Sequence, residues 1–281
     1  MTRPFRLVDV FGTDPLTGNP LGVIADADGL TGEAMQRIAN WLDFAETTFL
    51  LPPEDAAADY RVRIFTRERE LPFAGHPTLG SAHAWLEAGG RPKREGAIVQ
   101  ECGVGLVTIR RDGDRLAFAA PPLLRAGTPD EDELARVAAL LRIDRAAILD
   151  AAWADNGPGW LAVMLASAEA VLAIDAVAPP PGSARLNVGV VGPHRPGGDA
   201  AFEVRAIIAP GHGGLLEDPV TGSLNASVGQ WLFASGRAHG RYVAAQGTRL
   251  GRSGRIHVSQ DAEGQVWVAG ATTTLFEGAM R

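Results

Sequence analysis

The sequence predicts an α+β fold of two similar domains, each with a mostly antiparallel sheet wrapped around one central buried helix. The first observation behind this prediction is that short strand-like segments outnumber long helical ones along the chain. The second is that one uncharged helical segment occurs in each half, after Gly75 and after Gly222. The third is that strands and helices do not alternate strictly, which argues against a doubly wound parallel sheet.

The first uncharged helical segment begins within the stretch Pro72-Phe-Ala-Gly-His-Pro-Thr-Leu-Gly-Ser81. Pro77 suits the first turn of a helix, and Gly89-Gly90 can end it. Apart from two histidines, no residue from 71 to 86 can carry a charge, so the helix is expected to be buried. Its first N–H groups and its positive dipole end then point at one place beside His76. Since Gly75 lets a ligand approach the backbone closely, we expect an anion there.

A second stretch of the same kind, Glu217-Asp-Pro-Val-Thr-Gly-Ser223, leads into an uncharged segment that stops at Gly236. This helix is expected to be about one turn longer than the first. The two stretches lie about half a chain apart, as expected of two similar domains. The alternative, which the sequence leaves open, is two ordinary buried helices with suitable caps.

Composition and charge limit the function. A hydrophobic content of 46% and a charged content of 21% are typical of a globular protein, and 281 residues suffice for two domains. The net charge of −7 argues against a nucleic-acid partner. The single cysteine, Cys102, excludes a disulfide within the chain and fits a reducing compartment. No segment is apolar enough for a signal peptide or a membrane span, so we expect a cytoplasmic protein without a membrane partner.

The remaining elements follow from periodicity and turn residues. Helices are expected after Thr31 up to about Leu42 and from Asp130 to Leu141. Strands or short apolar segments are expected at 5–11, 21–25, 44–51, 60–66, 97–100, 105–110, 115–119, 151–155, 160–165, 170–174, 188–191, 202–208, 242–245, 255–259 and 265–269. Ala120-Pro-Pro122 marks a boundary, which predicts domains at 1–121 and 122–281, with the last few residues packing on the first domain.

Three residues are the main candidates for chemistry. Glu46 begins a hydrophobic strand, where loss of hydration raises the pKa of a carboxyl group toward neutrality and suits it to take a proton from carbon. The alternative is an ordinary, partly exposed glutamate at a strand end. Asp218 precedes a proline at a helix entrance, where it could also be an N-terminal cap. His76 is expected to be buried and neutral, so both of its ring nitrogens need partners.

Other kinds of site lack support in the sequence. His194, His212, His239 and His257 show no ligand spacing with Cys102 or with paired acids, so we expect no metal. No glycine-rich nucleotide-binding motif follows a strand, and no cofactor is expected. Ser81 and Ser223 do not stand in a nucleophile elbow.

Six motifs follow one another along nearly the whole chain: Val8-Asp-Val-Phe11, Gly18-Asn-Pro20, Glu46-Thr-Thr-Phe-Leu50, Gly75-His-Pro-Thr78, Glu217-Asp-Pro-Val-Thr-Gly-Ser223 and Gln246-Gly247. In these motifs and in their order the chain resembles the PhzF-like family, the phenazine-biosynthesis isomerases of the diaminopimelate epimerase-like fold. In that fold each of two pseudo-symmetric α+β domains is a curled, mostly antiparallel sheet around a central helix. The resemblance implies an active site in the cleft between two pseudo-symmetric domains, a homodimer, and isomerisation of a substrate like trans-2,3-dihydro-3-hydroxyanthranilate without a cofactor.

The resemblance also implies roles for single residues. Glu46 matches the acid–base glutamate, and His76 and Asp218 match its partners at the polar groups of the substrate. Gly75, Gly222 and Ser223 match the helix entrances that bind a small carboxylate-bearing substrate. The family lacks the cysteine pair of the diaminopimelate epimerases, and Cys102 lies in neither motif.

Three positions depart from the family pattern: Ala45 replaces the usual serine, Arg67 a common proline, and Leu224 a common small residue. These departures are compatible with the same proton chemistry, but they leave the identity of the substrate undecided. The main alternative reaction is epimerisation or racemisation, with Glu46 and Asp218 as the acid–base pair. A non-catalytic binding protein on the same fold is the other alternative.

Overall fold

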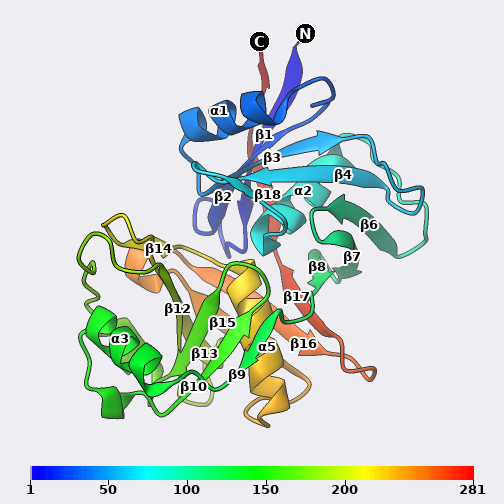
Figure 1. Cartoon of the computed structure of the whole chain (residues 1–281). Coiled ribbons are helices and arrows are strands. Elements are labelled where there is room, and N and C mark those ends of the chain that lie inside the picture. The colour runs from blue at the N-terminus through cyan, green and yellow to red at the C-terminus, as the bar shows by residue number, and fades with distance from the viewer. Residues whose placement is uncertain (1) are drawn as a thin grey trace. The chain divides into compact units, whose positions relative to one another are not determined.

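The structure, a computed structural model, describes residues 2–281 and divides the chain into two units (Figure 1). The first contains the described residues up to Ala119 together with Val268–Arg281, and the second is Ala120–Trp267. The sequence-based domains, 1–121 and 122–281, place the boundary close by. They differ in the C-terminal segment, of which only the last few residues were expected on the first domain.

The first unit is built on a sheet whose strands pair in the order β18-β1-β2-β3-β4-β6-β7-β8, with β5 also paired to β4. Its elements are β1 (Arg3–Val10), β2 (Asn19–Ile24), α1 (Gly32–Leu42), β3 (Glu46–Leu51), β4 (Tyr60–Phe65), β5 (Glu70–Leu71), α2 (Gly75–Glu87), β6 (Ala97–Cys102), β7 (Gly105–Asp112), β8 (Arg115–Ala119) and β18 (Thr272–Met280).

The second unit is built on a sheet in the order β9-β10-β11-β12-β13-β15-β16, with β14 also paired to β13. Its elements are β9 (Arg125–Gly127), α3 (Glu131–Leu141), η1 (Arg145–Ala147), β10 (Asp150–Asp155), β11 (Trp160–Met164), α4 (Ala168–Leu172), β12 (Leu186–Pro193), β13 (Phe202–Ala209), β14 (Leu216–Asp218), α5 (Gly222–Ala234), β15 (Arg241–Gln246), η2 (Thr248–Leu250) and β16 (Gly254–Gln260). The strand β17 (Val266–Gly270) runs across the boundary between the units.

The two sheets repeat one pattern of strand directions. Along β1-β2-β3-β4-β6-β7 the successive pairs are antiparallel, parallel, antiparallel, parallel and antiparallel. The same sequence of directions occurs along β10-β11-β12-β13-β15-β16. In both units a two- or three-residue strand precedes the central helix, which leads into the next long strand. The internal repeat expected from the two helix entrances therefore extends through most of each unit.

In the first unit the sheet encloses α2, which contacts β1, β2, β3, β6, β8 and β18 (Figure 1). Gly80 allows this close packing, because a Cβ there would lie 2.5 Å from Leu21 and 3.0 Å from Val10. The helix α1 packs through Met35 and Ala39 in a separate cluster of buried side chains, which includes Phe49 of β3 and Phe65 of β4. The sheet thus holds α2 in a fixed position, and with it the site described below.

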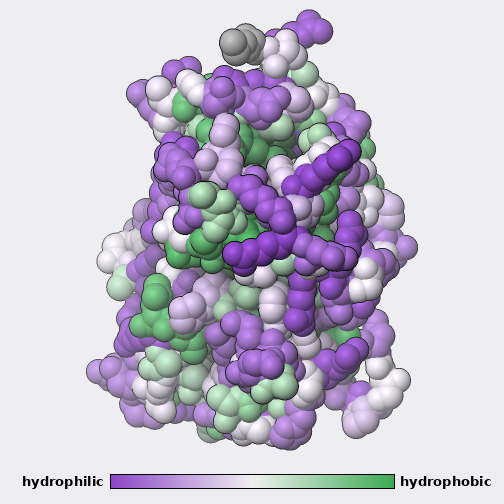
Figure 2. All heavy atoms as spheres, turned by 90° about the vertical axis from the view of Figure 1, so that its right-hand side faces the viewer, coloured by the Kyte–Doolittle hydropathy of each residue, from purple (hydrophilic) through white to green (hydrophobic). Residues whose placement is uncertain are grey.

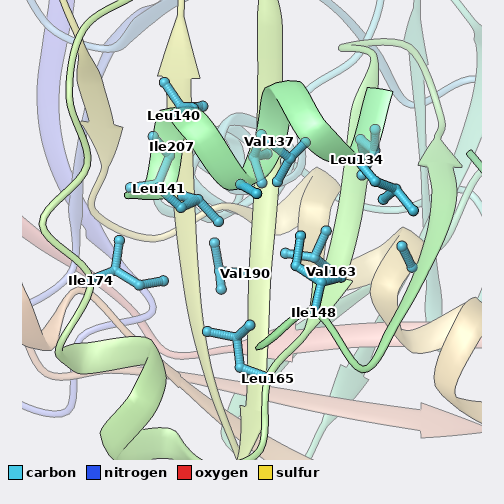
Figure 3. Close-up of a cluster of buried hydrophobic side chains, with 14 of the residues drawn as sticks. Leu134, Val137, Leu140, Leu141, Ile148, Val163, Leu165, Ile174, Val190 and Ile207 are labelled. Carbon is cyan, nitrogen blue, oxygen red and sulfur yellow. The ribbon is translucent and has the colours of Figure 1, made fainter. Parts of the chain in front are cut away.

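In the second unit α5 packs on β10 and β16, and Gly229 approaches Val258 and Val266 closely. A separate hydrophobic cluster packs α3 onto the sheet, as Figure 3 shows. Leu134, Val137, Leu140 and Leu141 lie on one face of α3, as the helical periodicity predicted. They meet residues of β11, β12 and β13, including Val163, Val190 and Ile207.

The helix α2 begins at Gly75, and Pro77, its third residue, lies in its first turn as expected. Three details differ from the sequence-based expectations. The helices α2 and α5 both contain 13 residues, so the second is not a turn longer. The short apolar segment at 170–174 is largely helical, because Ser167 caps α4 through the N–H of Ala170. The strand β18 was not expected, because its half-exposed, threonine-rich sequence lacks an alternating apolar face.

On the face shown in Figure 2, hydrophilic side chains predominate and hydrophobic ones form smaller patches between them. Among the described residues, no helix is long and apolar enough to cross a membrane.

Candidate active site

Two of the three candidate residues for chemistry meet in the first unit. Glu46 is the first residue of β3, and His76 is the second residue of α2. His76 Nε2 lies 3.5 Å from Glu46 Oε2, and the two side chains are 4% and 16% exposed. Thr48 lies two residues after Glu46 on β3, and its Oγ1 accepts a hydrogen bond of 2.9 Å from the Ser81 hydroxyl of α2. Residues two apart on a strand point to the same face, so this face of β3 packs against α2. A carboxylate and an imidazole that face each other in a buried place are suited to proton transfer.

Burial determines the protonation state of His76. With the ring enclosed by α2 and the sheet, desolvation lowers the pKa of His76 to about 3. The imidazole is therefore neutral near pH 7, with one nitrogen as donor and the other as acceptor. Asn19 Nδ2 lies 3.3 Å from His76 Nδ1. His76 Nε2 is buried and has no hydrogen-bond partner among the described residues, although Glu46 is close to it.

The N-terminus of α2 carries no side-chain cap. Its N-cap residue is Ala74, which has no polar side chain, and Gly75 and His76 are its first two residues. Hydrogen bonds from the sheet hold the start of the helix instead. Gln100 Nε2 of β6 donates to Thr78 Oγ1 at 3.0 Å, and the Tyr60 hydroxyl of β4 donates to Gln100 Oε1 at 2.9 Å. The N–H groups of Gly75 and His76 therefore have no side-chain cap, and they belong to the turn that carries the Glu46–His76 pair.

The second unit holds the remaining candidates at the N-terminus of α5. Asp218 ends β14, and its Oδ2 accepts a hydrogen bond of 2.5 Å from the Thr221 hydroxyl. The N-cap residue is Thr221, so Asp218 is not the helix cap, and Thr221 makes no side-chain capping bond. Gln246 fixes this turn: its Oε1 accepts the N–H of Thr221, and its Nε2 donates to Thr221 Oγ1. A glutamine thus contacts the first turn of each central helix: Gln246 bonds the N-cap residue of α5, and Gln100 bonds the hydroxyl of the fourth residue of α2.

Gly222 and Ser223 are the first two residues of α5, and both are buried. The hydroxyl of Ser223 accepts a hydrogen bond of 3.2 Å from Trp160 Nε1. Asn156 Nδ2 donates to the carbonyl oxygen of Ser223 at 2.9 Å. Since the Trp160 N–H occupies one lone pair of the Ser223 oxygen, the hydroxyl proton is available to donate elsewhere.

The other α-helices are capped in the usual way. Thr31 caps α1, Asp130 forms a capping box with Glu133 in α3, and Ser167 caps α4. Only the two central helices, α2 and α5, lack a side-chain cap among the α-helices of residues 2–281. Of the alternative interpretation, two ordinary buried helices with suitable caps, the side-chain caps are absent. The first N–H groups of both helices are free of side-chain caps, as an anion site requires.

Several residues of these networks were not singled out for a role. Asn19 and Gln246 stood only within motifs of the family resemblance, and Gln100, Thr221, Trp160 and Asn156 were not assigned at all. Their contacts join segments that are far apart in the sequence. No periodicity or spacing signal marks such pairs, although a buried amide or hydroxyl always needs partners.

The three departures from the family pattern lie in different surroundings. Ala45 is exposed next to Glu46. Arg67 is exposed and donates to Asp43 Oδ1 at 3.0 Å. Leu224 is fully buried and packs against the backbone of β12 at Gly189, where a Cβ would collide with it. Leu224 therefore fills the core of the second unit.

A groove of about 830 Å³ lies elsewhere in the first unit. It is lined by residues of β1, β2, α1 and β18, among them Phe5, Trp41 and Met280, and by Arg67. None of the six candidate site residues lines it. Among residues 2–281, no group of three or more histidine, cysteine or acidic side chains is arranged to hold a metal.

A repeated strand pattern, with one buried helix that lacks a side-chain cap in each unit, defines the class of fold: α+β with two similar units. The chain belongs to the phenazine biosynthesis-like protein family, whose model matches residues 8–278. This finding confirms the family resemblance.

Individual relatives agree with this assignment. Antisense-enhancing sequence 1 of Schizosaccharomyces pombe is 33% identical over 98% of this chain and 97% of its own. The trans-2,3-dihydro-3-hydroxyanthranilate isomerase of Pseudomonas aeruginosa is 50% identical over a shorter region, 28% of each chain. The structure of a predicted epimerase from Pseudomonas aeruginosa matches with a TM-score of 0.79 and 29% identity over 99% of both chains. The fold class is confirmed, and the protein is an enzyme of a family whose named relatives include isomerases and epimerases.

Proposed function

We propose that the protein is a cofactor-independent isomerase that moves a proton between two carbons of a small cyclic or unsaturated amino or hydroxy acid. The proposed reaction is similar to that of trans-2,3-dihydro-3-hydroxyanthranilate isomerase. One observation carries the proposal: the partly buried Glu46 carboxylate lies 3.5 Å from a neutral imidazole at the N-terminus of a helix that lacks a side-chain cap.

In the proposed reaction Glu46 is the acid–base group. As a carboxylate it removes a proton from a carbon that the carboxylate of the substrate or a conjugated double bond activates. The electron pair moves along the conjugated system, and Glu46, now a carboxylic acid, returns the proton to a different carbon. The carboxylate is regenerated, so neither a redox partner nor a second reactant is consumed.

His76 and Gly75 are proposed to bind the polar end of the substrate in the first unit. A neutral His76 cannot act as a cation, but it can donate one N–H bond to a group on which negative charge develops. The first N–H groups of α2 and the helix dipole favour a carboxylate at the same place.

For the second unit we propose that Asp218 binds the hydroxyl or amino group of the substrate and that Gly222 and Ser223 contribute donors. The Asp218 carboxylate already accepts the hydroxyl hydrogen of Thr221, which fixes one of its oxygens. The Ser223 hydroxyl accepts from Trp160 and therefore has its own proton to donate. Both features support a pre-organised binding surface, which needs little rearrangement when a ligand arrives.

Epimerisation or racemisation remains the second candidate reaction. It needs an acid and a base on opposite faces of one carbon, with Glu46 and Asp218 in these roles. The two acids do not occupy equivalent positions of the repeat. Glu46 begins β3, and the counterpart of β3 in the second unit, β12, begins with Leu186. Asp218 ends β14, which is the counterpart of β5. This asymmetry favours a single acid–base group over a matched pair.

The test uses trans-2,3-dihydro-3-hydroxyanthranilate in deuterated water, with the wild-type protein, Glu46→Gln and the control Glu95→Gln. Glu95 is exposed, so its substitution changes the charge equally without touching β3. We expect Glu46→Gln to lose roughly 10²- to 10⁴-fold in turnover and Glu95→Gln to lose nothing measurable. Deuterium at a migrated position supports isomerisation, and deuterium at an inverted centre supports epimerisation. A Glu46→Gln protein with near-normal turnover would remove Glu46 from its role, and a wild-type protein that only binds the compound would favour a non-catalytic protein.

Homodimeric assembly and a cytoplasmic location belong to the same proposal. The family resemblance supports the dimer, and a single cysteine suits a reducing compartment. Sedimentation at several protein concentrations would decide between monomer and dimer.

A further inference from the structure

Asn19 is a buried amide whose partner is His76, 57 residues further along the chain. Asn19 is the first residue of β2 and is completely buried. Its Nδ2 group lies 3.3 Å from His76 Nδ1. An amide nitrogen only donates, so Nδ1 must accept and carry no proton. A neutral imidazole has one N–H, which must then be on Nε2.

We propose that Asn19 is a positioning residue that holds His76 in the tautomer with the proton on Nε2, so that the ring presents its donor toward Glu46. The role of this donor in catalysis rests on the proposed function, whereas the tautomer itself does not.

The electrostatics beside Glu46 favour this tautomer. With the proton on Nε2, the ring presents a donor to Glu46 Oε2, 3.5 Å away. With the proton on Nδ1, the ring would present a lone pair to a carboxylate oxygen, and two acceptors would face each other in a buried place. A donor that is already oriented also stabilises negative charge on a substrate without reorganisation during the reaction.

The loop before β2 explains how Asn19 is held in place. The carboxylate of Asp9 is buried, and its Oδ2 accepts the N–H groups of Thr17 and Gly18, at 3.1 and 3.2 Å. Gly18 cannot be replaced easily, because a Cβ there would collide with the carbonyl oxygen of Val10. The loop therefore returns tightly, and Asn19 pairs with Val10 in the sheet. Two of the motifs that carry the family resemblance thus act together to position one amide.

The test reads the tautomer directly, by ¹⁵N–¹H correlation spectra of histidine-labelled protein near pH 7. Protonated and bare ring nitrogens have widely different ¹⁵N shifts, and a His76→Asn sample identifies the His76 signals among those of the six histidines. In the wild-type protein we expect a proton on Nε2 and a bare Nδ1. In Asn19→Asp we expect a proton on Nδ1, because a carboxylate accepts where the amide donated.

Asn40→Asp is the matched control, since Asn40 is exposed on α1 and its amide donates only to the carbonyl oxygen of Arg67. It should leave the His76 spectrum unchanged. Thermal melts show whether each variant is folded. If Asn19→Asp does not fold, the wild-type spectrum alone still shows which ring nitrogen of His76 carries the proton. A wild-type His76 with its proton on Nδ1, or a tautomer that is the same in wild-type and folded Asn19→Asp protein, overturns the proposal.

Turnover of trans-2,3-dihydro-3-hydroxyanthranilate separates this inference from the proposed function. If both hold, Asn19→Asp lowers kcat by roughly 10²-fold, the usual loss for one misplaced donor, with a much smaller change in KM. If the tautomer changes as expected but the wild-type protein does not turn over this compound, the proposed substrate is wrong and the role of Asn19 stands. If wild-type turnover is normal and the folded Asn19→Asp variant keeps both tautomer and kcat, Asn19 is merely a satisfied buried amide.

Discussion

The hydroxyl of Ser223 is an example of a donor whose direction a neighbouring residue sets. Trp160 Nε1 can only donate, and it lies 3.2 Å from Ser223 Oγ, with both residues buried. Ser223 must use its own hydrogen on another acceptor, and at the second position of α5 an anionic ligand is a suitable one. Asn19 and His76 form the corresponding arrangement in the first unit, where an amide sets the direction of an imidazole.

We predict that Ser223→Ala weakens binding of 3-hydroxyanthranilate by roughly 1 kcal/mol, or about fivefold in Kd, because one donor is lost while the helix N–H groups remain. Trp160→Phe should weaken binding less, since the ring stays and only the orientation of the hydroxyl is released. Calorimetric titration measures both effects. Ser235→Ala, near the other end of α5, is the control and should bind as the wild type does. Unchanged affinity in Ser223→Ala would show that the hydroxyl does not contact the ligand.

Single residues were predictable from the sequence where their chemistry is unusual for their surroundings. A glutamate that begins an apolar strand and a histidine in an uncharged helix are conspicuous, and the structure places them 3.5 Å apart. Their roles remain predictions. Asn19, Gln100 and Gln246 were not predictable, because a neutral amide fits many surroundings and its function depends on contacts across the fold.

At the scale of elements, the two central helices differ from the others in how their N-termini are satisfied. The helices α1, α3 and α4 use a side chain of the N-cap residue, whereas α2 and α5 are held by glutamines from the strands that follow them. A glutamine on a strand fixes each turn without capping the first N–H groups of the helix. The cost of leaving out a cap, typically about 1 kcal/mol, is offset by this support and by burial of the helix.

We predict that Gly222→Val abolishes binding of carboxylate ligands far more than it lowers thermal stability. Gly222 does not have a positive φ angle, so valine fits the backbone, but its two methyl groups would cover the first N–H groups of α5. Calorimetric titration with 3-hydroxyanthranilate, run beside thermal melts, measures both effects.

Gly278→Val is the control for this change, because Gly278 lies on β18 and a Cβ there meets nothing within 4 Å. Normal binding by Gly222→Val would place the anion elsewhere. An unfolded Gly222→Val protein would show that the glycine serves the fold.

Elements were predictable where a local signal coincides with the tertiary structure. Thr31 and Asp130 precede amphipathic segments, and both cap the helices expected there. The strand β18 was missed because it gains its order from pairing with β1, at the opposite end of the chain, and not from its own pattern.

At the scale of the whole molecule, the repeated strand pattern was predictable and the difference between the units was not. Both units follow one order of strand directions around an uncharged helix, which the two similar helix entrances had indicated. Yet at the N-terminus of its central helix the first unit has a carboxylate beside an imidazole, while the second presents Asp218 beside a threonine hydroxyl. The side chains at equivalent positions have diverged. The fold class therefore follows from pattern, and the substrate depends on individual residues.

The acid stability of the molecule follows from its buried histidine. In the unfolded chain His76 has a pKa near its ordinary value of 6.5, and burial lowers the pKa of the folded state to about 3. Between these values the unfolded chain binds a proton that the folded protein does not. The free energy of unfolding therefore falls as the pH falls through this window, by about 1.4 kcal/mol per pH unit for one proton. Burial also lowers the pKa of His83, which adds in the same direction, and raises the pKa of the Glu203 carboxyl, which opposes it.

The free energy of unfolding should depend less steeply on pH when His76 is replaced by asparagine. We predict that the contribution of one proton to the slope is lost, because asparagine does not titrate. Urea unfolding of wild-type and His76→Asn protein at several values between about pH 4 and about pH 7 gives the two slopes, which should differ by about 1.4 kcal/mol per pH unit in the middle of the range. His239→Asn is the control, because His239 is exposed and its removal should leave the slope unchanged. Parallel slopes for wild-type and His76→Asn protein would mean that His76 takes up a proton equally well in the folded and unfolded states. The neutral imidazole on which the proposed N–H donor depends would then be excluded.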